Sequence, residues 1–290
     1  MLSRILIIPL AIIALICLYL AWENQLSPIY IVPCVVMAAI ILIFSPQIDW
    51  WWAVRNPPPV DPMLEGFLRK FFPYYTQLSL SDKKYFMDRV SLYLIATEFI
   101  PMVMEHVPED IKGMIAANVV MLTFGQEDYR LAQFEKIVLY PHPFPSPQYR
   151  EIVHSTEHFE EDGVLLFSLE QLIPGITQKT KYYNIALHEY AKIFMLLNKD
   201  LPYPKFDDSI WENLSQISGF NTATVKNYIG LPVMEPLPVS INYFFTFPQK
   251  FQQVLPDIYD TYSRIFNQNP VNGNTPVVDV RKQRKQKVKG

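Results

Sequence analysis

Residues 183–192 read YNIALHEYAK, and this short stretch decides how the rest of the chain is interpreted. It contains the order His-Glu-x-x-Lys, with His188, Glu189 and Lys192 inside a helix predicted over 180–198. In the related pattern His-Glu-x-x-His, the two histidines lie one helical turn apart and bind one zinc ion, while the glutamate acts as general base on the bound water. Lys192 stands where the second histidine would be. The stretch therefore predicts a helix with a zinc-binding pattern in which one ligand is replaced.

The lysine changes the chemistry expected at this position. An ammonium group has no lone pair to give to a metal, and its positive charge repels Zn²⁺. To bind zinc at pH 7, the pKa of Lys192 would have to fall from ~10.4 to ~7, which costs about 4 to 5 kcal/mol. A His-Glu pair on a helix is by itself more often structural than catalytic, so the flanking sequence has to decide its role.

The flanking sequence predicts an α+β fold in which helices dominate. Two short apolar runs bounded by Pro or Gly, 134–140 (FEKIVLY) and 163–168 (GVLLFS), are typical of strands. Apolar residues at helical spacing predict a helix over 83–98 with Ser81 as its N-cap. Further helices are expected after a proline-rich turn, over 239–246 and 251–266.

Three stretches, in the order of the chain, resemble the Mlc titration factor A family of zinc-dependent peptidases. Residues 187–194 (LHEYAKIF) are similar to the zinc helix of that family, and 135–141 (EKIVLYP) are similar to one of its strands. The closing helices of the family are matched by Tyr243, Phe244, Phe245, Pro248, Phe251, Pro256, Tyr262, Phe266 and Pro270. The resemblance covers about 61–270, which is therefore expected to be one domain.

The resemblance implies a zincin-like metallopeptidase domain, helix-rich with a small sheet, and zinc as its cofactor. It implies that His188 is a metal ligand and that Glu189 is the catalytic base. The third ligand of the family is a glutamate eight residues before the tyrosine of the closing helix, which here is Glu235. A Pro-Leu-Pro sequence follows Glu235 and can only start a helix, so this carboxylate is expected at a helix N-terminus.

Two interpretations of the altered ligand position stay open. In the first, Lys192 takes the place of the metal as the central cation between Glu189 and Glu235, in a buried ion-pair network. In the second, another histidine completes a zinc site. The other histidines are His106, His142, His154 and His158. The last two lie in a charged stretch that favours a solvated face, and only His158 is kept as a candidate ligand.

Residues 1–48 are expected to form a hairpin of two transmembrane helices. Residues 5–22 and 24–48 carry no charge, and each is long enough to cross a bilayer, which takes about 20 apolar residues. A cleaved signal peptide is the alternative for the first segment. Basic residues precede the first segment and follow the second, which predicts a domain on the cytoplasmic side of a bacterial inner membrane. The Trp- and Pro-rich residues 49–60 are expected to be an interfacial linker.

The C-terminal tail, 271–290, is expected to be disordered and to lie against anionic lipid. Residues 279–290 contain six basic residues and one acidic residue, a charge that attracts phospholipid headgroups. No nucleic acid is expected as a partner, because such a tail alone is a weak signal for one. The only two cysteines, Cys17 and Cys34, lie in the apolar segments, so no disulfide is expected in the domain.

Two classes of function remain open. The first is an active metallopeptidase of the aminopeptidase type, with Glu189 as general base. The second is a pseudopeptidase that keeps the fold and binds a peptide or protein partner, such as a transcriptional regulator. The chemistry of Lys192 favours impaired or lost zinc catalysis. The sequence thus predicts a membrane-anchored protein of a zinc-dependent peptidase family whose zinc binding is in question.

Overall fold

The computed structural model of the chain describes residues 2–23 and 26–271. The chain divides into two compact units, residues 1–59 and residues 60–290. The basic tail expected over 271–290 lies outside the described residues, except for its first residue.

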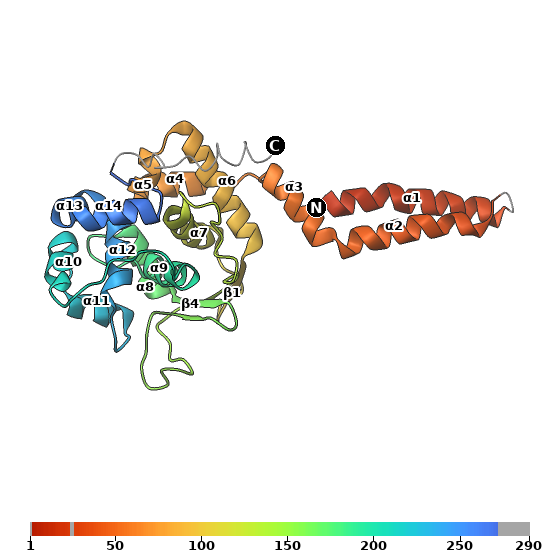
Figure 1. Cartoon of the computed structure of the whole chain (residues 1–290). Coiled ribbons are helices and arrows are strands. Elements are labelled where there is room, and N and C mark those ends of the chain that lie inside the picture. The colour runs from red at the N-terminus through yellow and green to blue at the C-terminus, as the bar shows by residue number, and fades with distance from the viewer. Residues whose placement is uncertain (1, 24–25, 272–290) are drawn as a thin grey trace. The chain divides into compact units, whose positions relative to one another are not determined.

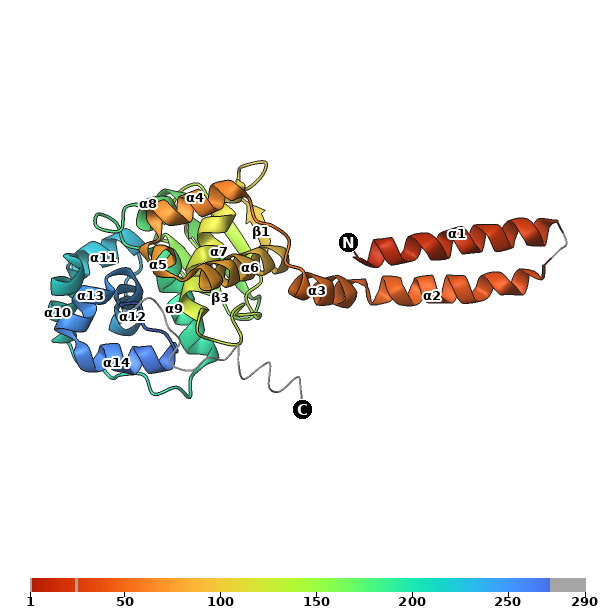
Figure 2. The same ribbon diagram turned by 90° about the horizontal axis from the view of Figure 1, so that it is seen from above.

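The first unit contains α1 (Leu2–Trp22), the short 3-10 helix η1 (Pro28–Tyr30), α2 (Ile31–Ile43) and α3 (Ser45–Arg55). Helices α1 and α2 pack side by side, as Figures 1 and 2 both show. Among the described residues, α1 is the one helix that is long and apolar enough to cross a membrane by itself. The pair of α2 and α3 passes the same test only together, and it bends by 64°. The structure therefore supports one clear apolar helix, an anchor or a signal sequence, where the sequence predicted two.

Residues 49–55 of the linker expected over 49–60 are helical, because α3 continues to Arg55. Asp49 in α3 accepts hydrogen bonds from the backbone N–H and the hydroxyl of Ser3, both at 2.9 Å, which fixes α3 to the start of α1. Three consecutive prolines follow at 57–59, and they stop the helix because proline has no backbone N–H to donate. Residues 56–61, between the end of α3 and the next helix, are not helical.

Side-chain caps set the start of several helices in the second unit. Asp61 accepts a backbone N–H at the start of α4 (Pro62–Phe71). Ser79 does the same for α6 (Leu80–Ala96), so the cap predicted at Ser81 is wrong. These caps satisfy N–H groups that the first turn of a helix leaves without a partner.

The second unit holds a four-stranded sheet with the order β1-β2-β4-β3. Strands β1 (Glu98–Pro101), β2 (Lys136–Tyr140) and β4 (Val164–Ser168) are parallel, and β3 (Thr156–Phe159) pairs antiparallel with β4. The predictions of strands over 134–140 and 163–168 are confirmed by β2 and β4. Neither β1 nor β3 was predicted. The helix expected over 83–98 ends at Ala96, and β1 begins at Glu98.

Helix α9 (Ile185–Leu197) carries the His-Glu-x-x-Lys sequence and lies in the middle of the second unit (Figure 1). It packs on β3 and β4 of the sheet, and also against α7 (Glu109–Thr123) and α12 (Pro236–Thr246). Nine of its thirteen side chains are buried, so this helix is part of the core. The helix-rich α+β fold with a small sheet, predicted from the sequence, is confirmed.

The remaining helices of the second unit are short. They are α5 (Pro73–Gln77), α8 (Leu169–Thr177), α10 (Ile210–Ser218), α11 (Thr222–Ile229), α13 (Pro248–Val254) and α14 (Pro256–Ile265). Helices α10 to α14 gather at one end of the unit (Figure 2). The single helix expected over 251–266 is divided into α13 and α14, because Pro256 starts a new helix.

Candidate functional site

The position of α9 is fixed at its N-terminus by Asn184. The side-chain oxygen of Asn184 accepts from the Leu187 N–H at 3.1 Å, and its side-chain nitrogen donates to Asn118 on α7 at 2.8 Å. The Asn184 carbonyl accepts from the Asn242 side chain on α12 at 2.7 Å. The start of α9 is therefore held by both neighbouring helices, which sets the direction of the side chains one turn later.

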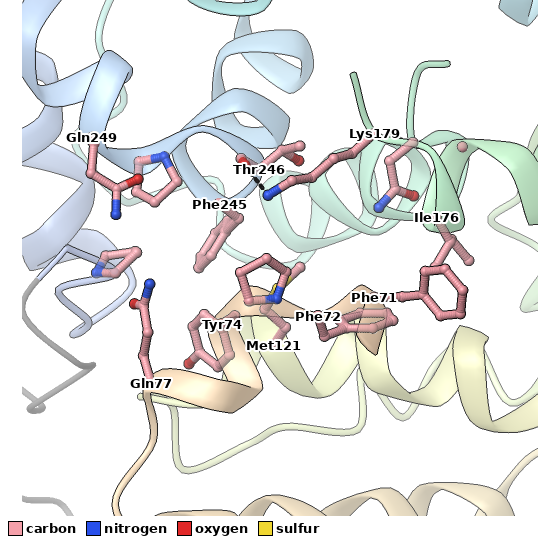
Figure 3. A pocket seen from close by; sticks show the side chains of 15 residues that line it. Phe71, Phe72, Tyr74, Gln77, Met121, Ile176, Lys179, Phe245, Thr246 and Gln249 are labelled. Carbon is pink, nitrogen blue, oxygen red and sulfur yellow. Dashed lines mark hydrogen bonds between the residues drawn. The ribbon is translucent and has the colours of Figure 1, made fainter. Parts of the chain in front are cut away.

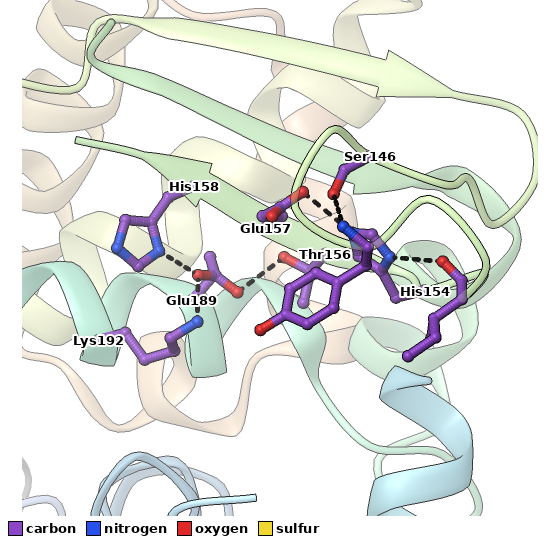
Figure 4. Close-up of polar contacts among 9 residues, drawn as sticks. Ser146, His154, Thr156, Glu157, His158, Glu189 and Lys192 are labelled. Carbon is purple, nitrogen blue, oxygen red and sulfur yellow. Dashed lines mark hydrogen bonds and ion pairs between the residues drawn. The ribbon is translucent and has the colours of Figure 1, made fainter. Parts of the chain in front are cut away.

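Glu189 is fully buried and its carboxylate accepts from three donors. The Lys192 ammonium lies 2.9 Å from Oε1, and the His158 Nδ1 lies 2.5 Å from the same oxygen. The Thr156 hydroxyl donates to Oε2 at 3.0 Å. Figure 4 shows Lys192 on the helix and His158 on strand β3 meeting at one oxygen. The carboxylate thus joins the helix to the edge of the sheet.

The negative charge of Glu189 and the positive charge of Lys192 stabilise each other. Burial disfavours the ionised form of Glu189, but the Lys192 ammonium and the His158 hydrogen bond outweigh it and hold the pKa of Glu189 well below its usual range. Burial also disfavours charged Lys192, and the Glu189 carboxylate outweighs that too, so the pKa of Lys192 is raised. Near pH 7 the pair is therefore an ammonium facing a carboxylate.

His188 lies next to this pair in a drier environment. It is 4% exposed, and its Nδ1 lies 2.7 Å from the Tyr183 hydroxyl. Burial lowers the pKa of His188 to about 3, and its neighbours Glu189 and Lys192 act in opposite directions. The imidazole is therefore neutral at pH 7, the form in which histidine binds metals.

His188, Lys192 and Glu235 line one cavity of about 140 Å³ together with Tyr149. Its other lining residues are Ile229, Leu231, Val233, Met234 and Pro238. Glu235 stands at the N-cap of α12, the helix N-terminus where the sequence placed it, and its exposed side chain makes no capping bond. Lys192 makes no ion pair with Glu235 among the described residues, although this carboxylate also raises the pKa of Lys192. The structure thus brings the predicted ligand positions together.

The residues of this cavity do not fit a zinc ion. Two neutral or anionic donors, His188 and Glu235, face it, and the third position holds the Lys192 ammonium. The oxygens of Glu189 are used by the three donors described above. Residues 2–23 and 26–271 contain no group of three His, Cys, Asp or Glu side chains that could hold a metal. Structural and catalytic zinc sites use at least three protein ligands.

The solvated face predicted for His154 and His158 is wrong. His154 is fully buried and lies 3.1 Å from the Glu157 carboxylate. His158 is half-buried and belongs to the Glu189 contacts, so it is not placed as a free ligand. Of the two other histidines, His106 is exposed, and His142 pairs with Glu170 at an exposed position.

Two further partners were missed by the sequence analysis. Thr156 lies in a strand that was not predicted, and Tyr183 contacts His188 across the start of α9. Residues 156–159 (TEHF) show no alternation of apolar and polar side chains that would predict a strand, and acidic residues follow them.

A family model gives the same assignment as these motifs. The model of glucose-regulated metallopeptidase M90 matches residues 48–201, which is more than half of the chain. This range includes β1 to β4 and α9 with His188, Glu189 and Lys192, whereas Glu235 lies beyond it. No curated protein matches the chain. The chain belongs to the glucose-regulated metallopeptidase M90 family, in agreement with its resemblance to Mlc titration factor A.

Proposed function

We propose that this protein is a member of a metallopeptidase family in which zinc catalysis is lost and a buried ion pair replaces the metal. The observation that carries the proposal is the contact of 2.9 Å between the Lys192 ammonium and Glu189. In a zincin-like site, the residues at these two positions would be a zinc ligand and the general base. Here each of them neutralises the other.

The surroundings of Glu189 support the loss of catalysis. A general base must accept a proton near pH 7, and it works best when its pKa is close to that value. The pKa of Glu189 is instead held well below its usual range, and all three of its contacts are donors to the ionised form. The carboxylate is therefore suited to a structural role between α9 and β3.

The proposal includes a binding function for the retained cavity. Its lining combines a cation, a carboxylate, a neutral imidazole and apolar side chains. A peptide segment of a protein partner, for example a transcriptional regulator, offers matching groups. We also propose that α1 anchors the chain in a bacterial inner membrane with the second unit in the cytoplasm and the basic tail at the lipid surface, because the basic residues flank the apolar segments.

An active metallopeptidase is the second candidate. One observation favours it, namely that His188 and Glu235 line the same cavity and His188 is neutral. In that case zinc would have two protein ligands, and Glu189 would need to be released from Lys192 before it acts as a base.

The zinc content of the purified full-length chain distinguishes a protein that has lost zinc catalysis from an active metallopeptidase. We expect less than one tenth of an equivalent of zinc in the unchanged protein and about one equivalent in Lys192→His, because three ligands then surround one position. Lys199→His is the matched control, since Lys199 is exposed and lies just beyond the end of α9. Stoichiometric zinc in the unchanged protein, lost in His188→Ala, would overturn the proposal and support the active enzyme.

A further inference from the structure

A second cavity of about 130 Å³ lies in the same unit and shares no lining residue with the first. Its walls come from α5, α7, α8, α12 and the segments beside them, and most of its lining is aromatic or aliphatic. Figure 3 shows Lys179 and Thr246 on one side and the rings of Phe72 and Tyr74 on the other. The lining residues are Phe71, Phe72, Pro73, Tyr74, Gln77, Met121, Gly175, Ile176, Lys179, Asn184, Phe245, Thr246, Pro248, Gln249 and Pro270.

Lys179 is the charged group of this cavity. The described residues that line it include no Asp or Glu. The ammonium donates one long hydrogen bond of 3.5 Å to the Thr246 carbonyl, and within residues 2–23 and 26–271 it forms no ion pair. Its side chain is half-buried, and this burial lowers the pKa of Lys179. An ammonium that has lost part of its water without gaining an anion is a site of unmatched positive potential.

The size and lining of the cavity limit what it can hold. One water molecule takes up roughly 10 to 15 Å³ of such a cavity. A cavity of about 130 Å³ therefore has room for on the order of ten non-hydrogen atoms. A purely apolar ligand would leave the ammonium unpaired, and a cationic ligand would be repelled by it. The remaining class has one negative group and a short apolar body.

We propose that this cavity is a binding site for a small amphipathic monocarboxylate, whose carboxylate meets Lys179 and whose apolar body lies among the aromatic rings. The carboxylate oxygens would accept charge-assisted hydrogen bonds from the ammonium, which are stronger than its long bond to Thr246. Gln77 and Gln249 supply further polar atoms in the lining. This inference is independent of the proposed function, because neither Lys192 nor Glu189 takes part in it.

Titration of the full-length chain in lipid nanodiscs with hydrocinnamate tests the proposal. Hydrocinnamate has a phenylethyl body and one carboxylate, and hydrocinnamamide is its uncharged counterpart. We expect saturable calorimetric binding of hydrocinnamate, weakened at least tenfold in Lys179→Met and unchanged in Lys181→Met. Lys181 is the matched control because it is exposed, lies two residues away and does not line the cavity. The amide should bind more weakly than the acid and with equal affinity to both variants.

A second variant tests the location of the ligand without touching the charge. Gln249 is exposed and lines the cavity, so Gln249→Trp should narrow it and weaken both the acid and the amide. Equal binding of hydrocinnamate to Lys179→Met and Lys181→Met would overturn the proposal. Absence of saturable binding to the unchanged chain, or binding that Gln249→Trp and Lys179→Met both leave intact, would overturn it as well.

Discussion

Replacement of Lys192 by methionine removes the ammonium from Glu189 and keeps most of the apolar stem of the side chain. Loss of one partner of a buried ion pair typically costs about 3 to 5 kcal/mol, because the other charge stays buried without compensation. Two features of this site reduce that figure. The Lys192 side chain is 27% exposed, and the carboxylate keeps its contacts with His158 and Thr156. We therefore expect Lys192→Met to lower the free energy of unfolding by about 2 kcal/mol.

Urea unfolding of the full-length chain, combined with a double-mutant cycle, measures the pair itself. Glu189→Gln keeps the shape of the side chain and removes its charge. In the double variant no buried carboxylate is left unpaired, so its loss of stability should be less than the sum of the two single losses. We expect a coupling energy of about 2 kcal/mol, within the range measured for contacting residues.

The exposed pair of Lys84 and Asp88 is the control for this cycle. Its two side chains are 76% and 32% exposed at a distance of 3.0 Å, and such i,i+4 pairs contribute about 0.3 to 0.5 kcal/mol. A coupling energy for Lys192 and Glu189 that is no larger than that of the Lys84 pair would refute the reasoning. The ammonium would then be a solvated group beside the site and not a replacement for the metal.

Three further predictions concern stability in the same unit. His188 is buried in its neutral form, and its pKa is lowered from an ordinary 6.5 to about 3. Its burial therefore stabilises the fold above pH 6.5, and this stabilisation is lost as the pH falls. The unfolding free energy should drop by up to about 1.4 kcal/mol per pH unit between pH 6 and 4.5, and less steeply in His188→Gln. Gly175→Ala should destabilise by about 1 to 3 kcal/mol in thermal unfolding, because the added Cβ would lie 2.3 Å from the Tyr183 carbonyl oxygen, whereas Gly66→Ala, with no atom within 4 Å, should stabilise by about 0.5 to 1 kcal/mol. Ser79→Ala should cost about 1 kcal/mol through loss of its cap and Ser81→Ala much less, and equal losses in urea unfolding would contradict the cap assignment.

Local sequence signals predicted the elements that carry their own pattern. The apolar runs of β2 and β4 and the helical spacing around His188 were sufficient to predict a helix-rich α+β domain. The position of Glu235 at a helix N-terminus followed from the two prolines after it, since proline permits only that place. These features depend on residues close together in the chain.

The contacts of Glu189 depend on residues far apart and were only half predicted. Lys192 lies on the same helix, three residues away, so its contact with Glu189 could be anticipated. Thr156 and His158 lie about thirty residues earlier, on an edge strand whose sequence is charged enough to look solvated. Their side chains reach the carboxylate because β3 packs on α9, and no pattern within residues 151–163 records that packing.

Lys179, just before α9, and Lys192, within α9, have pKa shifts in opposite directions, because different groups of the protein face them. At Lys192 the protein supplies the anion, so burial is outweighed, the pKa rises and the ammonium becomes part of the fold. At Lys179 the described residues supply only a carbonyl, so burial dominates and the pKa falls. An anion that enters from solution gains most where the protein has left a cation unmatched, because it need not displace an internal carboxylate. The Lys192 ammonium of the His-Glu-x-x-Lys sequence already faces a carboxylate of the protein, whereas the Lys179 ammonium does not, so we expect a small carboxylate to bind in the aromatic cavity beside Lys179.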